Sequence, residues 1–274
     1  MKSHHLRLAT HPDLDYQKLS VLMPVYNEEN TLAEIIDRVL QVPLRLDLEI
    51  VAVDDGSTDG SWETLQSLAQ RDHRILAIQH ERNRGKGAAI RTAISHFTGD
   101  VAVIQDADLE YDPQDYLALL APILSDKADV TFGSRYCGES RRVQPYWHSM
   151  VNYSLTTISN MLNNLTLTDM ETCYKMARAD LLKRLHLTSN TFTLEPELTA
   201  RLSQAHARIY EVPVSYEGRS YREGKKIGVL DGVKAIGQML RCRYWDTKHF
   251  TDESEHVVHH ARITETAGQL RKTA

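Results

Sequence analysis

Short apolar runs alternate with amphipathic segments through the first half of the chain. Apolar, β-branched runs predict strands, whereas apolar positions three and four residues apart predict helices. The strands predicted in this way are residues 19–26, 48–55, 75–80, 100–105 and 129–134, and the helices are 30–40, 61–70, 88–97 and 113–124. This regular alternation indicates an α/β fold, with a mostly parallel central sheet flanked by helices.

The second half has longer amphipathic segments and fewer strands. We expect helices over residues 147–165, 195–204 and 229–244, a strand over 208–216, a loop, short strand and helix within 168–185, and a basic flexible segment over 218–228. We therefore predict a single domain over residues 19–244. An N-terminal extension over 1–18 precedes it, and a polar tail over 245–274 follows it.

Composition narrows the class of protein. The formal net charge of -5 argues against a globally basic nucleic-acid binder. Cys137, Cys173 and Cys242 form no CxxC pair, which fits a reducing compartment better than disulfides or a zinc site. There is no apolar run of about 18 residues and no apolar leader segment at the N-terminus, so neither a transmembrane helix nor a secretory signal is expected. These features predict a cytoplasmic protein.

A basic region near the end of the predicted domain leaves two interpretations open. Between Glu217 and Tyr244 there are seven basic residues against three acidic ones. An amphipathic helix beside such charge can rest on an anionic membrane surface as a peripheral contact. The same helix can equally be a core-packing element. Within the segment, Arg222, Lys225 and Lys226 can clamp a phosphate or form a solvated loop.

Polar sequence follows each of the first five predicted strands. The strand tails read VYNEEN, VDDGSTD, QHERNRGKG, QDADLE and GSRY. In sheets of this kind, ligands bind beyond the carboxyl ends of the strands. The five tails together indicate a nucleotide-binding layer.

The QDADLE tail carries acids on alternate positions. Asp106, Asp108 and Glu110 fall on one side of an extended chain, because strand side chains repeat every two residues. Carboxylate oxygens suit Mg²⁺ or Mn²⁺, with phosphate oxygens and water as the remaining ligands. A metal and a diphosphate would offset the repulsion, so these acids need no buried basic residue opposite them. The alternative is a solvated acidic turn, and Asp112 is expected to cap the helix that follows Pro113.

The VDDGSTDGS tail places Asp54 and Asp55 where a buried strand meets solvent, and Gly56 permits the turn. These carboxylates can accept hydrogen bonds from a base or from ribose hydroxyls. The alternative is an Asp-rich turn in which Ser57 or Asp59 caps the next helix, and both interpretations can hold together.

Two further tails carry candidate binding residues. In PVYNEEN, Pro24 and Tyr26 can frame a flat base and Asn27 or Glu28 can bond to it, while Asn30 is predicted to cap the next helix. In RNRGKG, Lys86 lies at a helix N-terminus, where free N–H groups and the helix dipole favour an anion. This loop is not a phosphate-binding loop of the GxxxxGK[ST] type, and close packing of its glycines is the alternative.

Taken together, these strings resemble glycosyltransferase family 2, and more closely its dolichol-phosphate mannosyltransferase-like branch. The resemblance runs from about Ser20 to Tyr244 and rests on nine motifs in family order. The motifs are LMPVYNEENTL, VDDGSTDGS, NRGKGAAI, QDADLEYDP, FGSRY, TDMETCYK, FTLEPELTARL, VPVSYEGR and YREGKKIG. The resemblance implies the A-type glycosyltransferase fold, with a nucleotide-sugar half over residues 19–136 and an acceptor half over 137–244.

The resemblance also implies an activity, namely inverting transfer of a hexose, mannose or glucose, from GDP-mannose or UDP-glucose. The QxxRW signature of processive synthases is absent, so the transfer is expected to be non-processive. The residues that match the family's nucleotide-sugar-binding positions are Pro24, Tyr26, Glu28, Asp54, Asp55, Lys86 and Asp106. The metal is expected to bind Asp106, Asp108 and Glu110, although Glu110 stands where the mannosyltransferases usually carry Gln.

The acceptor decides the remaining roles. A polyprenyl phosphate is already anionic and needs no strong base, so Arg135, Arg222, Lys225 and Lys226 would orient it for attack. The hydroxyl of a soluble sugar, a glycan or a protein would need a base, and Asp169 or Glu195 are the candidates. Either acid can instead be structural, Asp169 as a turn cap and Glu195 as the start of a helix. The predicted catalytic set is therefore Asp108, Arg135, Asp169 and Glu195.

Overall fold

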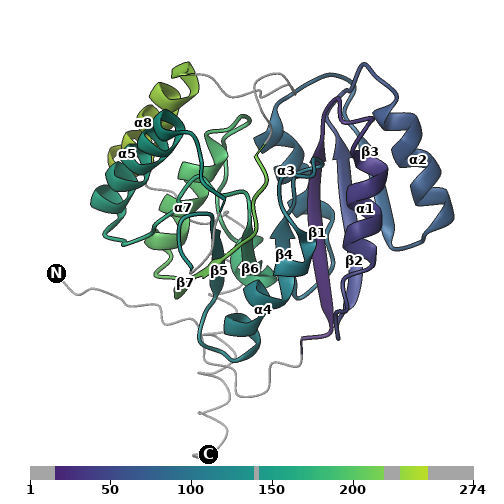
Figure 1. Cartoon of the computed structure of the whole chain (residues 1–274), viewed down its shortest axis with the longest axis horizontal. Helices are drawn as coiled ribbons and strands as arrows, with labels where there is room; N and C mark the ends of the chain where they lie inside the picture. The colour runs from purple at the N-terminus through teal and green to yellow at the C-terminus, as the bar shows by residue number, and fades with distance from the viewer. Residues whose placement is uncertain (1–15, 139–141, 219–228, 246–274) are drawn as a thin grey trace, which may run out of the picture.

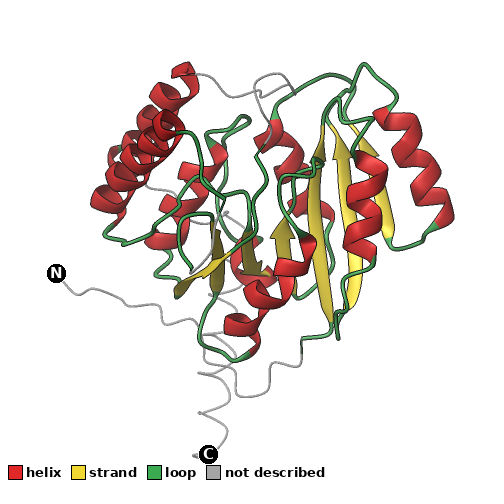
Figure 2. Ribbon diagram, in the orientation of Figure 1, coloured by secondary structure: helices red, strands yellow, loops and turns green. Residues whose placement is uncertain are grey.

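A seven-stranded sheet flanked by helices forms the centre of the computed structural model, which describes residues 16–138, 142–218 and 229–245, without the side chains of 229–231 (Figures 1 and 2). The strands are β1 (Lys18–Val25), β2 (Asp47–Asp54), β3 (Ile75–Gln79), β4 (Val101–Ile104), β5 (Val130–Ser134), β6 (Lys175–Arg178) and β7 (Ile209–Pro213). The helices are α1 (Leu32–Leu40), α2 (Ser61–Arg71), α3 (Lys86–His96), η1 (Pro113–Asp115), α4 (Tyr116–Leu124), α5 (Tyr146–Asn163), α6 (Ala179–Leu182), α7 (Leu194–Gln204) and α8 (Val229–Tyr244). The predicted α/β class is confirmed.

The order of strands across the sheet is β3-β2-β1-β4-β6-β5-β7. All neighbouring pairs are parallel except those that β6 makes with β4 and with β5. Because β4 and β5 both run antiparallel to β6, they point the same way as β1, β2 and β3. The carboxyl ends of β1 to β5 therefore meet at one edge of the sheet.

Apolar burial explains why these segments adopt their elements. The predicted face of α1 (Leu32, Ile35, Ile36 and Val39) is fully buried. Each such side chain contributes about 1.5–3 kcal/mol relative to remaining exposed. Helix α3 instead presents small residues, including Ala89 and Ala93, and packs against β1 and β2.

Three local predictions need correction. Helix α1 begins at Leu32, with Thr31 rather than Asn30 at the N-cap position, because the Glu28 carbonyl accepts the N–H groups of Thr31 and Leu32. Helix α3 begins at Lys86, two residues earlier than predicted. The strand predicted over 208–216 ends at Pro213, which has no N–H to donate to a sheet.

Helices α5, α7 and α8 pack together beside the β5–β7 end of the sheet (Figure 1). Helix α5 ends at Asn164, whose left-handed backbone (φ 55°) is a conformation that Asn tolerates at a helix C-terminus. Within the described residues, no helix is both long and apolar enough to cross a membrane.

Candidate active site

The predicted site residues in the described ranges gather around the carboxyl edge of the sheet. Asp54 ends β2 and Asp55 follows it. Lys86 is the first residue of α3, Asp106 and Asp108 follow β4, and Arg135 follows β5. Asp169 lies in the loop between α5 and β6, and Glu195 lies in the first turn of α7. Arg222, Lys225 and Lys226 lie outside the described residues, so their predicted phosphate role stays a prediction.

A cavity of about 450 Å³ opens beside the ends of β2 and β3. It is lined by Tyr26, Gly56, Ser57, Thr58, Gln79, His80, Glu81, Arg82 and Asn83. Gly56 has φ +69°, and a Cβ there would lie 2.5 Å from the Arg82 carbonyl carbon, so only glycine fits. Pro24 lies within β1, paired with Val53. The cavity has the place and the aromatic wall expected for a nucleoside.

Asp54 and Asp55 have different surroundings. In Asp54, Oδ2 accepts the Ser57 N–H at 3.2 Å and the Gln79 amide at 3.3 Å, but buried Oδ1 has no partner among the described residues. In Asp55, both oxygens are used, by the His80 ring at 2.7 Å and by the N–H groups of Arg84 and Gly85. A buried unpaired acceptor costs about 1–3 kcal/mol, which a ligand donor would recover. Asp54 is therefore the better candidate for binding, and Asp55 shapes the loop before α3.

The tails of β1 and β2 are held together by side chains that sequence reasoning missed. The Asn27 N–H donates to Ser57 Oγ, and Asn27 Oδ1 accepts the Thr58 N–H at 2.8 Å. The Glu28 N–H donates to Ser61 Oγ at 2.9 Å. Asp59 accepts the Ser61 N–H at 3.0 Å, but the N-cap position of α2 is Gly60, so the predicted cap is displaced by one residue.

Lys86 joins the end of β4 to the start of α7. Its ammonium lies 2.8 Å from Asp106 Oδ1 and 3.1 Å from Glu195 Oε1. Burial alone would lower the pKa of Lys86, but the carboxylates of Asp106 and Glu195 raise it well above its usual value. The acids were predicted to need no buried basic residue opposite them, but the structure places one against Asp106. Lys86 is that residue, because the start of α3 faces the end of β4.

The predicted metal ligands are not assembled into a three-carboxylate cluster. Asp108 Oδ1 accepts the Glu110 N–H at 3.1 Å, and Glu110 Oε2 accepts the Tyr216 hydroxyl at 2.8 Å. Within the described ranges, no three His, Cys, Asp or Glu side chains lie close enough to hold a metal ion. Mg²⁺ is commonly held by one or two carboxylates, with phosphates and water completing its shell. Asp106 and Asp108 fit that mode, and the metal role of Glu110 stays a prediction.

Arg135 and Asp169 form a buried two-bond ion pair. Nε and Nη2 of Arg135 lie 2.6 and 2.8 Å from the two Asp169 oxygens, and the Arg135 N–H donates to Oδ2 as well. Asn152 donates to Oδ1 at 3.2 Å. Burial would lower the pKa of Arg135, but the Asp169 carboxylate raises it well above its usual value. Fully buried and already accepting four hydrogen bonds, Asp169 is suited to positioning Arg135 rather than to acting as a base.

Two further ionisable residues near Glu195 were not singled out from the sequence. The pKa of Glu171 is raised to about 7 by burial and by the Glu195 carboxylate. Burial also lowers the pKa of Lys175, although Glu195 and Glu171 oppose the shift. Buried Glu171 Oε1 and Glu195 Oε2 have no hydrogen-bond partner in the described structure. Glu171 and Lys175 both lie in the motif TDMETCYK, in which the sequence predicts a role for Asp169 alone.

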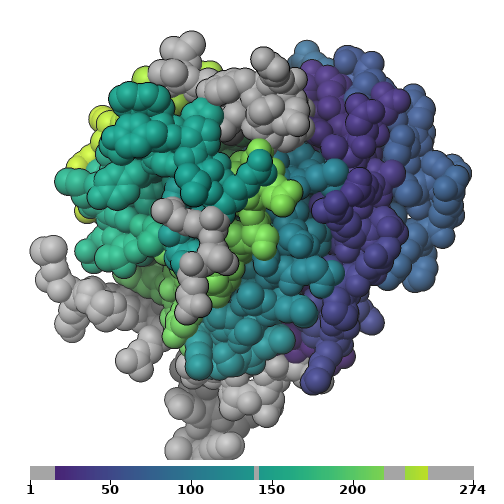
Figure 3. All heavy atoms as spheres, in the orientation of Figure 1, coloured from purple at the N-terminus to yellow at the C-terminus, as the bar shows by residue number. Residues whose placement is uncertain are grey.

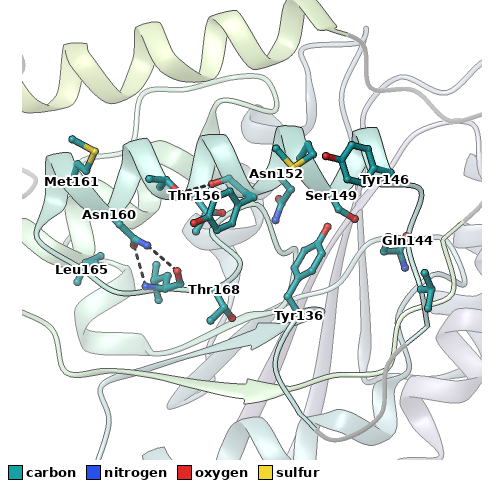
Figure 4. Close-up of a pocket in the computed structure, with 15 residues that line it drawn as sticks. Tyr136, Gln144, Tyr146, Ser149, Asn152, Thr156, Asn160, Met161, Leu165 and Thr168 are labelled. Carbon is teal, nitrogen blue, oxygen red and sulfur yellow. Dashed lines mark hydrogen bonds between the residues drawn. The ribbon is translucent and has the colours of Figure 1, made fainter.

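A second and larger cavity, of about 680 Å³, runs along α5 (Figure 4). It is lined by Tyr136, Val143, Gln144, Tyr146, Ser149, Met150, Asn152, Tyr153, Thr156, Thr157, Asn160, Met161, Leu165, Leu167 and Thr168. In Figure 4 the Tyr136 side chain extends toward α5 near Asn152 and Ser149. Since Asn152 also bonds to Asp169, this cavity adjoins the Arg135–Asp169 pair.

Comparison with known proteins identifies the family. The model described as glycosyl transferase family 2 matches residues 20–185, more than half of the chain. The chain belongs to glycosyltransferase family 2. The resemblance inferred from the nine motifs is thereby confirmed.

Curated relatives of this family member include two enzymes named for polyprenyl phosphates. The dolichol-phosphate mannosyltransferase of Pyrococcus furiosus is 26% identical over 83% of this chain and 63% of its own length. The undecaprenyl-phosphate 4-deoxy-4-formamido-L-arabinose transferase of Edwardsiella ictaluri is 27% identical over 82% of this chain and 68% of its own length. The chain thus spans about two thirds of these relatives.

Among solved structures, glucosyl-3-phosphoglycerate synthase of Mycobacterium tuberculosis in complex with UDP superposes with a TM-score of 0.63. The two proteins are 19% identical, and the match covers 85% of this chain and 82% of the synthase. Another structure of that synthase contains Mn²⁺, UDP and phosphoglyceric acid. At this identity the likeness establishes the shared fold.

Proposed function

We propose that the chain is an inverting, non-processive glycosyltransferase that moves a hexose from a nucleotide-diphosphate sugar to a polyprenyl phosphate. The observation that carries the proposal is the cavity along α5 beside the Arg135–Asp169 pair. The cavity offers apolar side chains among its lining, and the Arg135 cation lies beside it, next to the Asp169 carboxylate that Asn152 of the lining also contacts. A polyprenyl phosphate carries the matching chemistry, an apolar chain that ends in an anion.

The apolar lining favours a lipid over a purely polar acceptor. Met150, Tyr153 and Met161 are 40%, 66% and 80% exposed, which is unusual for large apolar side chains on a helix. Each methylene of an isoprenoid chain buried there would contribute about 0.8 kcal/mol. At the Asn152 end, Nε and Nη2 of Arg135 face Asp169, so Nη1 is the guanidinium nitrogen not used by that pair. It is the nitrogen best placed to meet an acceptor phosphate.

For the donor, the cavity beside β2 and β3 would take the nucleoside, with Tyr26 at its wall and Asp54 supplying an acceptor. GDP-mannose and UDP-glucose are the first donors to examine. Mg²⁺ or Mn²⁺ at Asp106 and Asp108 would neutralise charge on the departing diphosphate. The names of the curated relatives, and the Mn²⁺ and UDP of the synthase complex, support this arrangement.

The exposed aromatic residues at the start of α5 favour activity at a membrane surface. Tyr146 and Trp147 are 66% and 75% exposed, and their ring centroids lie 5.1 Å apart. Such residues are enriched where protein meets lipid headgroups. We propose a peripheral contact on the cytoplasmic side, which co-sedimentation with anionic vesicles would test.

The deciding experiment is transfer from a panel of nucleotide sugars, with and without a polyprenyl phosphate. We expect transfer to depend on the lipid phosphate, with Met150→Glu raising the KM of a long-chain acceptor at least about tenfold. The KM of a short-chain analogue should change little. Leu124→Glu is a matched control, because Leu124 is similarly exposed but lies at the end of α4. Equal transfer to water-soluble hydroxyl acceptors without lipid would overturn the proposal in favour of a soluble acceptor.

A further inference from the structure

The Arg135 guanidinium has an aromatic neighbour in addition to Asp169. Its central carbon lies over the Tyr216 ring, 5.1 Å from the ring centroid, and Tyr216 comes three residues after the end of β7. A guanidinium within about 6 Å of a ring centroid is attracted to the negative face of the ring. Asp169 fixes the plane of the guanidinium through Nε and Nη2, but its charge also offsets the charge that would attract a phosphate. An aromatic ring holds the same cation without adding a negative charge.

The Tyr216 side chain is itself fixed at both ends. Its hydroxyl donates to Glu110 Oε2 at 2.8 Å. Its backbone forms an isolated antiparallel bridge with Tyr111, whose ring centroid lies 5.0 Å from its own. The next residue, Glu217, donates its N–H to the Glu110 carbonyl at 2.7 Å. A Cβ at Gly218 would lie 2.9 Å from Cε1 of the Tyr216 ring, so the chain also packs closely against the ring. The segment after β7 is thus held against the segment after β4.

The bond between Tyr216 and Glu110 has a defined direction. Burial raises the pKa of Tyr216 above its ordinary value of 10, Glu110 raises it further, and Arg135 opposes them. The hydroxyl therefore stays protonated near neutral pH and donates to the carboxylate, which makes the hydrogen bond charge-assisted and stronger than a neutral one. Glu110 follows Asp106 and Asp108 on the tail of β4. The pair therefore connects the tail of β4, through the Tyr216 ring, to the cation that follows β5.

We propose that Tyr216, oriented by Glu110, positions the Arg135 guanidinium to bind the phosphate of the acceptor. This inference rests on the polyprenyl phosphate acceptor proposed above. Tyr216 acts through Arg135, so it is a positioning residue. Its hydroxyl should therefore influence affinity for the phosphate group and leave affinity for the apolar chain, which the cavity along α5 would hold, almost unchanged.

The test compares equilibrium binding of a short-chain prenyl phosphate with that of the corresponding prenyl alcohol, without nucleotide or added metal. Wild type should prefer the phosphate. Tyr216→Phe removes only the hydroxyl, and it should weaken phosphate binding about tenfold, the typical effect of losing one hydrogen bond to a charged group. Alcohol binding should change by less than about twofold. Tyr210→Phe is the matched control, because Tyr210 is 44% exposed on β7 and should bind both ligands as wild type does.

Glu110 variants test the connection between the two residues. Glu110→Met removes the acceptor of the hydroxyl and should weaken phosphate binding as much as Tyr216→Phe does. The double variant should bind no more weakly than either single variant, because both changes break the same hydrogen bond. Glu110→Gln keeps an oxygen that can accept from the hydroxyl, so it should restore most of the affinity. The unfolding temperature of every variant is measured to show that each is folded.

Several results would overturn the inference. One is equal weakening of phosphate and alcohol binding in Tyr216→Phe, which indicates a merely structural role. Others are phosphate binding within about twofold of wild type in that variant, additive losses in the double variant, or a wild type that does not prefer the phosphate to the alcohol. Wild type that binds the lipid phosphate but transfers no hexose to it would overturn the proposed function and leave this inference standing. In transfer assays, Tyr216→Phe should raise the KM of the acceptor and leave that of the donor unchanged.

Discussion

At the scale of single residues, adjacent positions of one motif have unlike environments. Asp54 ends β2 and Asp55 follows it, yet one has an unpaired buried oxygen and the other is bonded to His80, Arg84 and Gly85. The difference arises because successive side chains at a strand end point to opposite sides. Asp55 meets His80 and the loop before α3, whereas Asp54 meets Ser57 and the Gln79 amide and keeps one oxygen without a partner among the described residues.

This difference predicts opposite phenotypes for two matched substitutions. Asp54→Asn should weaken nucleotide binding about tenfold or more and leave unfolding nearly unchanged. Asp55→Asn should lower the free energy of unfolding by about 1–3 kcal/mol, because buried N–H donors lose a charged acceptor. Titration calorimetry with the nucleoside diphosphate and urea unfolding separate the two effects. Equal loss of binding in both variants at equal stability would contradict the assignment.

Asp108 permits a second prediction at this scale. Asp108→Ala should reduce transfer by at least about 100-fold and abolish the Mn²⁺ dependence of donor binding, because a carboxylate ligand is lost. Asp112→Ala is the control, since Asp112 caps η1 through the Gln114 N–H and lies in the same acidic run. Full activity of Asp108→Ala would exclude the metal role.

At the scale of elements, the N-terminus of α3 is positioned by close backbone contact with the loop before α7. Gly85 has φ +100°, and a Cβ there would collide with the Asn190 carbonyl. The next residue, Lys86, reaches Asp106 and Glu195 from this fixed start. The position of the first turn of α3 thus determines how Lys86 reaches Asp106 and Glu195.

Gly85→Ala should therefore impair both stability and activity. The strained backbone and the collision predict a loss of about 1–3 kcal/mol in the free energy of unfolding. Lys86 should shift with it, so kcat should fall more than in Gly237→Ala, a control on α8 where a Cβ would meet nothing within 4 Å. Chemical unfolding and steady-state kinetics measure the two effects. A Gly85→Ala protein as stable and active as the control would contradict this view of the loop.

At the scale of the whole molecule, ionisable groups form the candidate site at one edge of the sheet and stabilise the fold at the other. Away from the site, Glu49 joins β1 to the loop before β4 by accepting from Lys18, Ser20 and Thr98. Burial raises its pKa, but these donors outweigh burial and lower the pKa to about 2 from an ordinary 4.5. A depressed carboxyl pKa stabilises the fold above the unfolded value and loses that effect as pH falls toward the folded value.

Stability should therefore fall between about pH 4.5 and pH 2 partly because Glu49 takes up a proton. Glu49→Gln should unfold at lower urea than wild type at pH 7, and the difference should vanish near pH 2. Urea midpoints measured across this range, beside the surface change Glu63→Gln, test the prediction. A pH-independent difference between Glu49→Gln and wild type would contradict it.

Much of the fold could be predicted because its signals are local. The buried face of α1, the runs that became β1 to β5 and the cap at Asp112 depend on residues a few positions apart. The spacing of apolar residues along the sequence determines which face of a helix or strand is buried, so the pattern alone predicts such elements. The sequence also determined which strand tails bear the candidate chemistry, and the family match confirms the family those motifs indicated.

Only the tertiary structure decided which of these residues contact one another. Lys86 meets Glu195, 109 positions away, and Asp169 meets Arg135 from across α5. The antiparallel insertion of β6 between β4 and β5 brings the TDMETCYK loop to the site edge. No local pattern encodes such pairings, because they depend on how the whole chain packs. For that reason the sequence could identify Asp169 as a candidate but not its pairing with Arg135.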